Sequence, residues 1–347
     1  PRPDVTFPEG TGKPYRAVVF MMFSGGCDSF NMLTPYTCTR GKDLYQEHVD
    51  VRQQVALGRQ DLLNIPAAEN QICEEFGIHS SLPSVRDLYM DEDLIFFANT
   101  GVMSRPVNKQ NYRTLEQTQL FAHNHQQRES KRVDPYDTNS GTGILGRISD
   151  TLIELGHNVG SFSVDRYSVA LVGAPGKSSS PMIVNRNGVP DVYLGDIEEY
   201  LPKLHNQTKP ESPYFGEMWS DNLMTSLGNN EVLSKELEGV KLDTQFGTSY
   251  LARQFETVAK LIKTRSSRGA DTDTFYVETG GFDTHSMIET NLNNRFIGVN
   301  EGIRDLTAAL KELGVWENTV VVQTSDFART LNPNGGDGTD HAWGGNY

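Results

Sequence analysis

Acidic and histidine side chains gather in short segments that follow, or lie just beyond, three apolar runs of the chain. These residues are Asp28, Asp283, His285, Asp326, Asp340 and His341. Aspartate and neutral histidine are ligands of zinc and similar ions, whereas carboxylates alone suit calcium or magnesium. Carboxylates crowded into one crevice would repel each other unless a cation neutralised their charge. The residues therefore predict a site for one or two divalent ions, which would bind and polarise an anionic ester.

Each of these residues, taken alone, also has a structural explanation. An aspartate that follows a strand is most often a helix cap or a turn residue, and a glycine pair is usually a turn. A single histidine is usually a surface residue or a hydrogen-bonded one. We favour a functional site because the acidic segments follow three separate apolar runs.

Five short, nearly continuous apolar runs predict the strands that would position these side chains. Such runs are typical of parallel strands that are buried on both faces. They cover residues 17–23, 94–98, 168–172, 274–277 and 319–322. Apolar residues at helical spacing predict helices over residues 143–156, 255–262 and 302–313.

Alternating strands and helices indicate a doubly wound α/β fold, with a mostly parallel central sheet and helices on both faces. Such sheets bind ligands beyond the carboxyl ends of their strands, where the acidic segments would lie. We expect a single domain over residues 1–347, with a surface insertion or cap at about 177–247, where Pro, Asn, Gly and Ser are frequent. A two-domain organisation stays open because no linker marks a boundary.

Composition limits the classes of partner. The formal net charge of −14 argues against sequence-independent binding of nucleic acid, which needs phosphate-neutralising cations. An anionic substrate stays compatible with this charge because a bound metal ion reverses the local field. No apolar run approaches the ~20 residues of a membrane-spanning helix, so we expect no membrane span.

The three cysteines, Cys27, Cys38 and Cys73, are too few for a disulfide framework. They allow one disulfide bond with one thiol left over, or three free thiols.

The acidic segments also resemble a known family. Gly-Gly-Phe-Asp-Thr-His at 280–285 and Gly-Thr-Asp-His at 338–341 are specific motifs, and Gly-Gly-Cys-Asp at 25–28 is a weaker one. Together with Ser-Asp-Phe-Ala-Arg-Thr at 325–330, they resemble domain-of-unknown-function family 1501 of the alkaline-phosphatase/sulfatase superfamily. The resemblance covers nearly the whole chain.

The resemblance implies an alkaline-phosphatase-like sheet with metal ligands at its strand ends. Asp28 would be the first-strand ligand, Asp283 and His285 the central pair, Asp326 the next ligand and His341 the last histidine. Asp340 matches the family motif. Superfamily hydrolases commonly have His or Asn at the position of Phe327, so this chain lacks one expected ligand.

The catalytic groups are predicted by position and by resemblance. Thr100 and Ser104 follow the second apolar run and are the candidate nucleophiles, with Ser29 as another. The guanidinium of Arg329 could bind an anionic ester bidentately, or it could pair with a local aspartate. His123 and His125 lie in a polar segment and could reach the pocket, although exposed loop histidines are the usual case. Cys27 lacks the Cys-x-Pro-x-Arg context of a sulfatase's modified cysteine.

The resulting hypothesis is a metal-dependent hydrolase of phosphate or sulfate esters, acting on a small anionic ester or on a sulfated or phosphorylated glycan. Zinc, calcium or magnesium would be its cofactor. The alternative is a non-catalytic secreted structural or binding protein that retains the fold. A phosphoglycerate-mutase-like phosphotransferase is a third class, which would need a basic phosphosugar pocket.

The resemblance also implies a secreted, periplasmic or extracellular location. Family members usually continue past the position of Tyr347, so we expect that a C-terminal part is missing or that a partner chain supplies it.

Overall fold

The computed structural model describes residues 6–137, 139, 141–177, 181–190, 195, 200–201 and 214–347. Its centre is a five-stranded parallel sheet, which confirms the predicted α/β class with a parallel sheet. In sheet order, the strands are β6 (Met182–Val184), β5 (Val159–Val164), β7 (Thr272–Gly280), β1 (Arg16–Ser24) and β8 (Thr319–Ser325).

Strand β1 lies between β7 and β8 and sets their register. Ser24 at its end pairs with Gly280 of β7, and Phe23 pairs with Ser325 of β8. The three strands therefore end at one edge of the sheet, and the segments that follow them begin side by side. This register is the reason that residues far apart in sequence can form one site.

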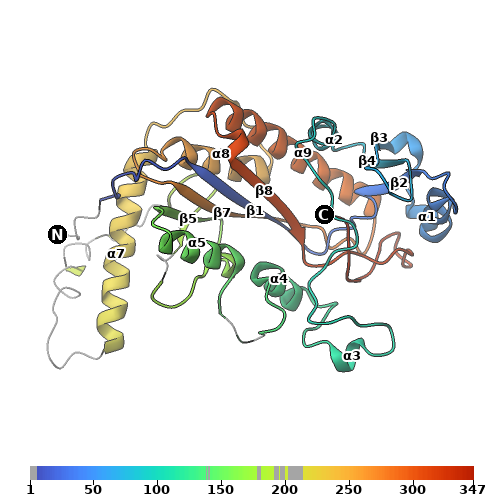
Figure 1. The fold of residues 1–347 in the computed structure, drawn as a ribbon, viewed down its shortest axis with the longest axis horizontal. Coiled ribbons are helices and arrows are strands. Elements are labelled where there is room, and N and C mark those ends of the chain that lie inside the picture. The colour runs from blue at the N-terminus through green and yellow to red at the C-terminus, as the bar shows by residue number, and fades with distance from the viewer. Residues whose placement is uncertain are drawn as a thin grey trace.

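Side chains of β1 alternate between two apolar layers, as a strand requires. Val19, Met21 and Phe23 face a core shared with α8 (Tyr250–Lys263) and α9 (Ile288–Glu312). Phe20 and Met22 face a smaller cluster that includes Leu145. Leu145 belongs to α5 (Ile144–Glu154), which lies on the same side of the sheet as α4 (His123–Arg132), opposite α8 and α9 (Figure 1). Helices thus cover both faces, as predicted.

A second, antiparallel sheet follows β1 in sequence. Its order is β2 (Leu33–Thr37), β4 (Glu75–His79) and β3 (Leu62–Pro66), with α1 (Leu44–Arg52) and α2 (Pro83–Met90) beside it. Cys38 and Cys73 form a disulfide bond next to β2 and β4, and Cys27 is a buried free thiol. One bridge with one thiol left over was one of the two predicted arrangements.

Two of the five predicted strands are wrong. Residues 168–172 contain a short 3-10 helix, Val169–Leu171, whose apolar side chains pack under the sheet, with Ala170 and Leu171 buried. Residues 94–98 belong to neither sheet. Both runs are apolar because they cover or line the core, and an apolar run does not by itself specify sheet pairing.

The three predicted helices exist, and α9 is longer than expected because it begins at Ile288. Within the expected insertion at 177–247, the described residues include β6, which joins the central sheet, and α7 (Tyr214–Leu237). Much of the rest of that insertion lies outside the described residues. A short helix, α3 (Tyr112–Leu115), lies between α2 and α4 in sequence.

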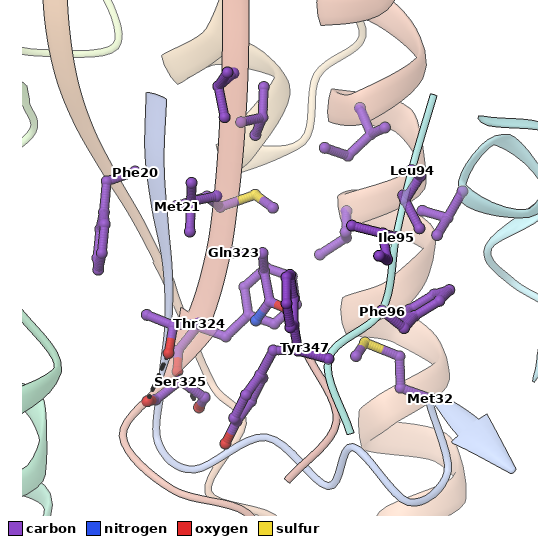
Figure 2. A pocket seen from close by; sticks show the side chains of 18 of the residues that line it. Phe20, Met21, Met32, Leu94, Ile95, Phe96, Gln323, Thr324, Ser325 and Tyr347 are labelled. Atoms are coloured by element: carbon purple, nitrogen blue, oxygen red, sulfur yellow. Dashed lines mark hydrogen bonds between the residues drawn. The ribbon is translucent and has the colours of Figure 1, made fainter. Parts of the chain in front are cut away.

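A hollow of about 790 Å³ runs along the outer edge of β8. Leu94, Ile95 and Phe96 lie across it from Gln323 of β8, with Tyr347 at one end (Figure 2). The described residues that line it are mostly apolar; they include Glu92, Asp93, Glu317 and Asp326 but no Lys or Arg. This charge pattern does not suit an anionic ester. Among the described helices, none is long and apolar enough to cross a membrane.

Candidate metal centre

The loops after β1 and β7 contact each other through a glycine. Gly25 has φ +121°, and a Cβ at this position would lie 2.6 Å from the backbone nitrogen of Asp283. Only glycine combines this conformation with so close an approach. The Gly-Gly pair after β1 therefore allows the Asp283 loop to lie against it.

The segment after β8 turns back on itself. Arg329 forms an isolated bridge with His341, and the backbone of Ala342 donates to Ala328. His341 is thereby returned to the edge of the sheet that carries Asp283.

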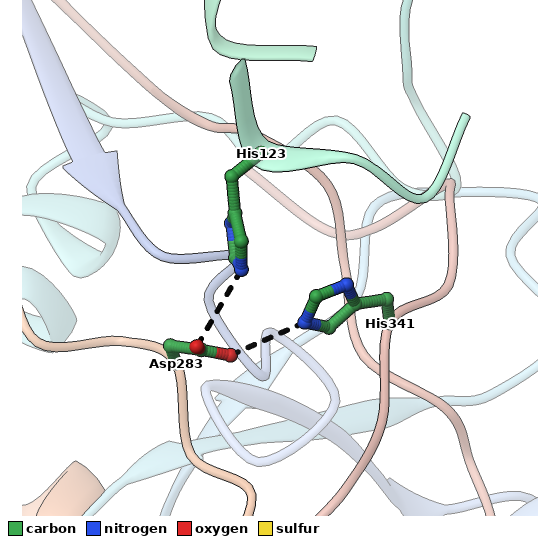
Figure 3. Close-up of side chains that lie close together, drawn as sticks. All are labelled: His123, Asp283 and His341. Atoms are coloured by element: carbon green, nitrogen blue, oxygen red, sulfur yellow. Dashed lines mark hydrogen bonds and ion pairs between the residues drawn. The ribbon is translucent and has the colours of Figure 1, made fainter. Parts of the chain in front are cut away.

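Three histidines surround the carboxylate of Asp283. Nε2 of His285 lies 3.0 Å from Oδ1, Nε2 of His341 lies 3.3 Å from Oδ1, and Nε2 of His123 lies 3.5 Å from Oδ2. His123 and His341 approach the carboxylate from different sides (Figure 3). The Nε2 atoms of His285 and His341 are 3.0 Å apart. We call His123, Asp283, His285 and His341 the histidine cluster.

The other ring nitrogen of each histidine has an acceptor of its own. Nδ1 of His341 donates to the carbonyl of Phe121 at 2.8 Å, and a carbonyl can only accept. Nδ1 of His123 lies 2.7 Å from Asp326, and Nδ1 of His285 lies 3.0 Å from Asp340. Protons on the three Nδ1 atoms leave the three Nε2 atoms as lone-pair donors that converge on Asp283.

Converging lone pairs are unfavourable unless a proton or a cation lies between them. A tetrahedral zinc ion with bonds of about 2.0–2.1 Å separates its ligand atoms by about 3.3 Å. The contacts of Asp283 with the three histidines, and the contact between His285 and His341, span 3.0–3.5 Å. His123, Asp283 and His341 each bring one ligand atom within 4.8 Å of the other two, so they fit three positions of one tetrahedral ion, and the fourth position is open to His285 or to solvent.

Asp283 is held as a carboxylate. Partial burial alone would raise its pKa, but the hydrogen bond and charge of Arg329, together with His285 and His123, keep the pKa below its usual value. Nη1 of Arg329 lies 2.6 Å from Oδ1. An ionised aspartate at neutral pH is the form that a metal ion requires.

Asp326 and Asp340 act on the cluster through their histidines. Asp326 is buried and accepts from the backbone N–H of Gly25 at 3.1 Å and from Gln127 at 2.9 Å, besides its contact with His123. Asp340 accepts from Asn334 at 3.0 Å and from His285, and these two hydrogen bonds lower its pKa. Carboxylates in this position orient metal-bound histidines and fix their tautomer.

The chain's C-terminal third carries most of this arrangement. Residues 221–347 match the family model for a protein of unknown function, DUF1501. The DUF1501 match contains β7, α9 and β8, and with them five of the six predicted metal residues: Asp283, His285, Asp326, Asp340 and His341. No curated protein and no solved structure matches the chain significantly.

Asp28, which lies outside the DUF1501 match, belongs to a separate network. Its buried carboxylate pairs with Arg52 at 2.8 Å and accepts from the hydroxyl of Thr339 at 2.9 Å and the backbone of Asn31 at 3.3 Å. Thr339 precedes Asp340, so Asp28 supports the loop that carries the cluster. The structure brings the other predicted metal residues to one place but gives Asp28 a partner of its own.

Three of the predicted catalytic groups, Ser104, Ser29 and Arg329, are hydrogen-bonded to other groups, and Thr100 lies at the hollow beside β8. Thr100 pairs through its backbone with Gly345 and lines the hollow beside β8. Ser104 is buried and donates to Glu116 at 3.0 Å. Ser29 accepts from the backbone of Asn346 at 2.9 Å. Arg329 is fully buried, donates to Asp283 and to the carbonyls of Gly25 and Thr339, and has no free face for an ester.

Phe327 occupies the position where a further ligand was expected. Its buried ring packs against His123 and His341, each with ring centroids 4.8 Å apart. An apolar ring in this place stiffens the two histidines, and it offers no atom to a second metal ion.

Sequence reasoning underestimated His123. It lies at the start of α4, about 160 residues before Asp283, and its role depends on how α4 packs beside the end of β8. The pair of histidines at 123 and 125 was the available signal, but polarity alone placed both of them in a solvent-exposed segment. His125 is exposed, as expected.

Proposed function

We propose that this chain is a metal-dependent hydrolase of small anionic esters, with the histidine cluster as its metal site. The observation that carries the proposal is the convergence of three histidine Nε2 atoms on the Asp283 carboxylate while each Nδ1 is bound elsewhere. Histidines that only stabilise a fold have no reason to share this orientation.

Zinc, or a transition ion with similar preferences, is the cation that this ligand set favours. Calcium and magnesium prefer sites made entirely of oxygen atoms, whereas three imidazoles and one carboxylate suit zinc. The space beside His123 and His341 is occupied by Phe327, which favours one ion over two.

Accessibility supports a catalytic rather than a purely structural site. The side chains of the cluster are 25–47% exposed, so a solvent molecule or ester oxygen can reach the cation position. Structural zinc sites are closed, and catalytic ones keep a position open. A bound cation would polarise an ester oxygen and make a water molecule more acidic.

The protein's own side chains orient these partners. Asp326 and Asp340 hold the imidazoles, and Arg329 keeps Asp283 ionised. Because the hydroxyls of Ser104 and Ser29 are hydrogen-bonded to other groups and Thr100 lines the hollow beside β8, we assign the attack on the ester to water, without a covalent enzyme intermediate. This differs from the mechanism that the sulfatase resemblance implies. We also propose that the chain is related to the alkaline-phosphatase/sulfatase superfamily.

A secreted, metal-binding protein without catalytic activity is the second candidate, and the missing nucleophile favours it. Both candidates place the chain in an oxidising compartment, which the Cys38–Cys73 disulfide supports.

Assays with an aryl phosphate and an aryl sulfate separate the two candidates. Zinc-loaded protein should hydrolyse at least one of them, and chelation or Asp283→Ala should abolish both the activity and the bound zinc. Thr100→Val and Ser104→Ala should retain activity, because their hydroxyls take no part. Stoichiometric zinc with both esters intact would support the non-catalytic candidate instead.

A further inference from the structure

The loop after β7 presents alternate residues to solvent. Gly281, Asp283 and His285 are exposed, whereas Phe282 and Thr284 between them are buried. The segment is a tight loop, because the backbone of Thr284 donates to Phe282 and that of His285 to Asp283. Gly281 is exposed, as the two cluster residues are, and it lies two positions before Asp283.

The side chain of Arg295 covers this glycine. A Cβ at position 281 would lie 2.4 Å from Nε and 2.5 Å from Cζ of Arg295. The guanidinium therefore packs directly on the bare backbone of Gly281, which has φ +92°. Arg295 lies in the first part of α9, and helical side chains tilt toward the N-terminus, here the end next to His285.

Within the described part of the chain, Arg295 is exposed and makes no ion pair or hydrogen bond. Arg304 on the same helix contacts Asp305 at 2.7 Å, and Arg329 contacts Asp283. An unpaired guanidinium thus packs on Gly281, two positions before Asp283, in a chain with a net charge of −14.

We propose that Arg295 is the specificity-determining residue for anionic substrates at the histidine cluster. Its planar fork would bind two oxygens of a phosphate or sulfate group while a third oxygen faces the cation position beside Asp283. This inference rests on the proposed metal site. It replaces the role predicted for Arg329, whose guanidinium is fully buried and therefore out of reach of an ester.

The test uses inorganic phosphate as the probe and the zinc-loaded full chain as the receptor. Isothermal titration calorimetry compares wild type with Arg295→Gln, Arg295→Lys and the control Arg304→Gln, and zinc content is measured on every sample. Arg304→Gln removes an exposed charge from the same helix, nine residues or about 14 Å further along α9. Arg295 is exposed, so its replacement should leave the fold intact.

We expect the phosphate Kd to rise about tenfold to a hundredfold in Arg295→Gln, because charged hydrogen bonds are lost. Arg295→Lys should fall between this variant and wild type, and Arg304→Gln should match wild type. Full zinc content with equal phosphate affinity in wild type and Arg295→Gln would overturn the role of Arg295 alone. A wild-type chain that holds no zinc would overturn the metal site, and the inference with it.

Discussion

The Nε2 atoms of His285 and His341 face each other at 3.0 Å, and the Nδ1 atoms of both rings are already hydrogen-bonded to other groups. Two neutral imidazoles in this arrangement direct lone pairs at one another. Either one extra proton or one cation must lie between them. The nearby Asp283 carboxylate suits either positive species, and the lone pair of His123 favours a metal ion.

Asp326 is expected to tune metal affinity without binding the metal itself. In Asp326→Asn, the amide nitrogen would face one of the donors that now surround the carboxylate: His123, Gln127 or Gly25. His123 would lose its fixed orientation, and zinc affinity should fall about 10- to 100-fold. Competition with a chromogenic chelator measures this change. The exposed Asp50→Asn is the matched control, and equal affinities in both variants would contradict the assigned role.

Asp28 is expected to contribute to stability rather than to metal binding. Asp28→Asn leaves Arg52 as a buried charge without its carboxylate, which should lower the free energy of unfolding by about 3–5 kcal/mol. Urea denaturation measures this loss, and zinc content at saturation should stay at the wild-type value. A folded variant that no longer holds zinc would contradict this purely stabilising role and show that the metal site needs the Asp28 carboxylate.

His79 is expected to make stability depend on pH. Burial lowers its pKa to about 4, and its Nδ1 accepts from the backbone of Ser81, so the folded state keeps the ring neutral. The unfolded state takes up a proton below about pH 6.5, so the stabilisation is complete above that pH and is lost as the pH falls toward 4.

The contribution of His79 to unfolding free energy should fall by about 2 kcal/mol between pH 7 and pH 5. His79→Asn, which retains an acceptor for Ser81, should remove this part of the pH dependence in urea denaturation. Burial and the charge of Arg52 lower the pKa of His48 to about 4. His48 therefore adds a pH dependence of similar size, and this part stays unchanged in His79→Asn. An unchanged pH dependence in His79→Asn would refute the assignment.

The central strands were predictable because parallel strands buried on both faces give continuous apolar runs. Strands β1, β7 and β8 all follow this pattern, and their shared register brings the residues after them together. The pairing of Asp283 with His285 and His341 therefore followed from sequence. The short β2, β3 and β4 did not, because they alternate or carry polar residues and pair in a sheet of their own.

The roles of individual site residues were less predictable, because they depend on packing between distant segments. Asp28 pairs with Arg52, which lies 24 positions further along the chain. His123 contacts the cluster only because α4 packs beside it. Asp326 and Asp340 have the residue types of metal ligands, yet their hydrogen bonds to histidines place them behind the cluster. Residue type predicts which chemistry is available, and tertiary packing decides which atom faces the centre of the histidine cluster.

The most direct test of this account is the metal content of the purified protein, measured by elemental analysis in wild type and in Asp283→Ala combined with His285→Ala. The histidine cluster predicts close to one zinc or similar transition ion per chain in wild type, and its loss in the double variant with the fold retained by circular dichroism. Freshly purified, chelator-free wild type that contains no metal and takes up none on addition of zinc would contradict the account. The three histidines and Asp283 would then be a hydrogen-bonded cluster without a cation.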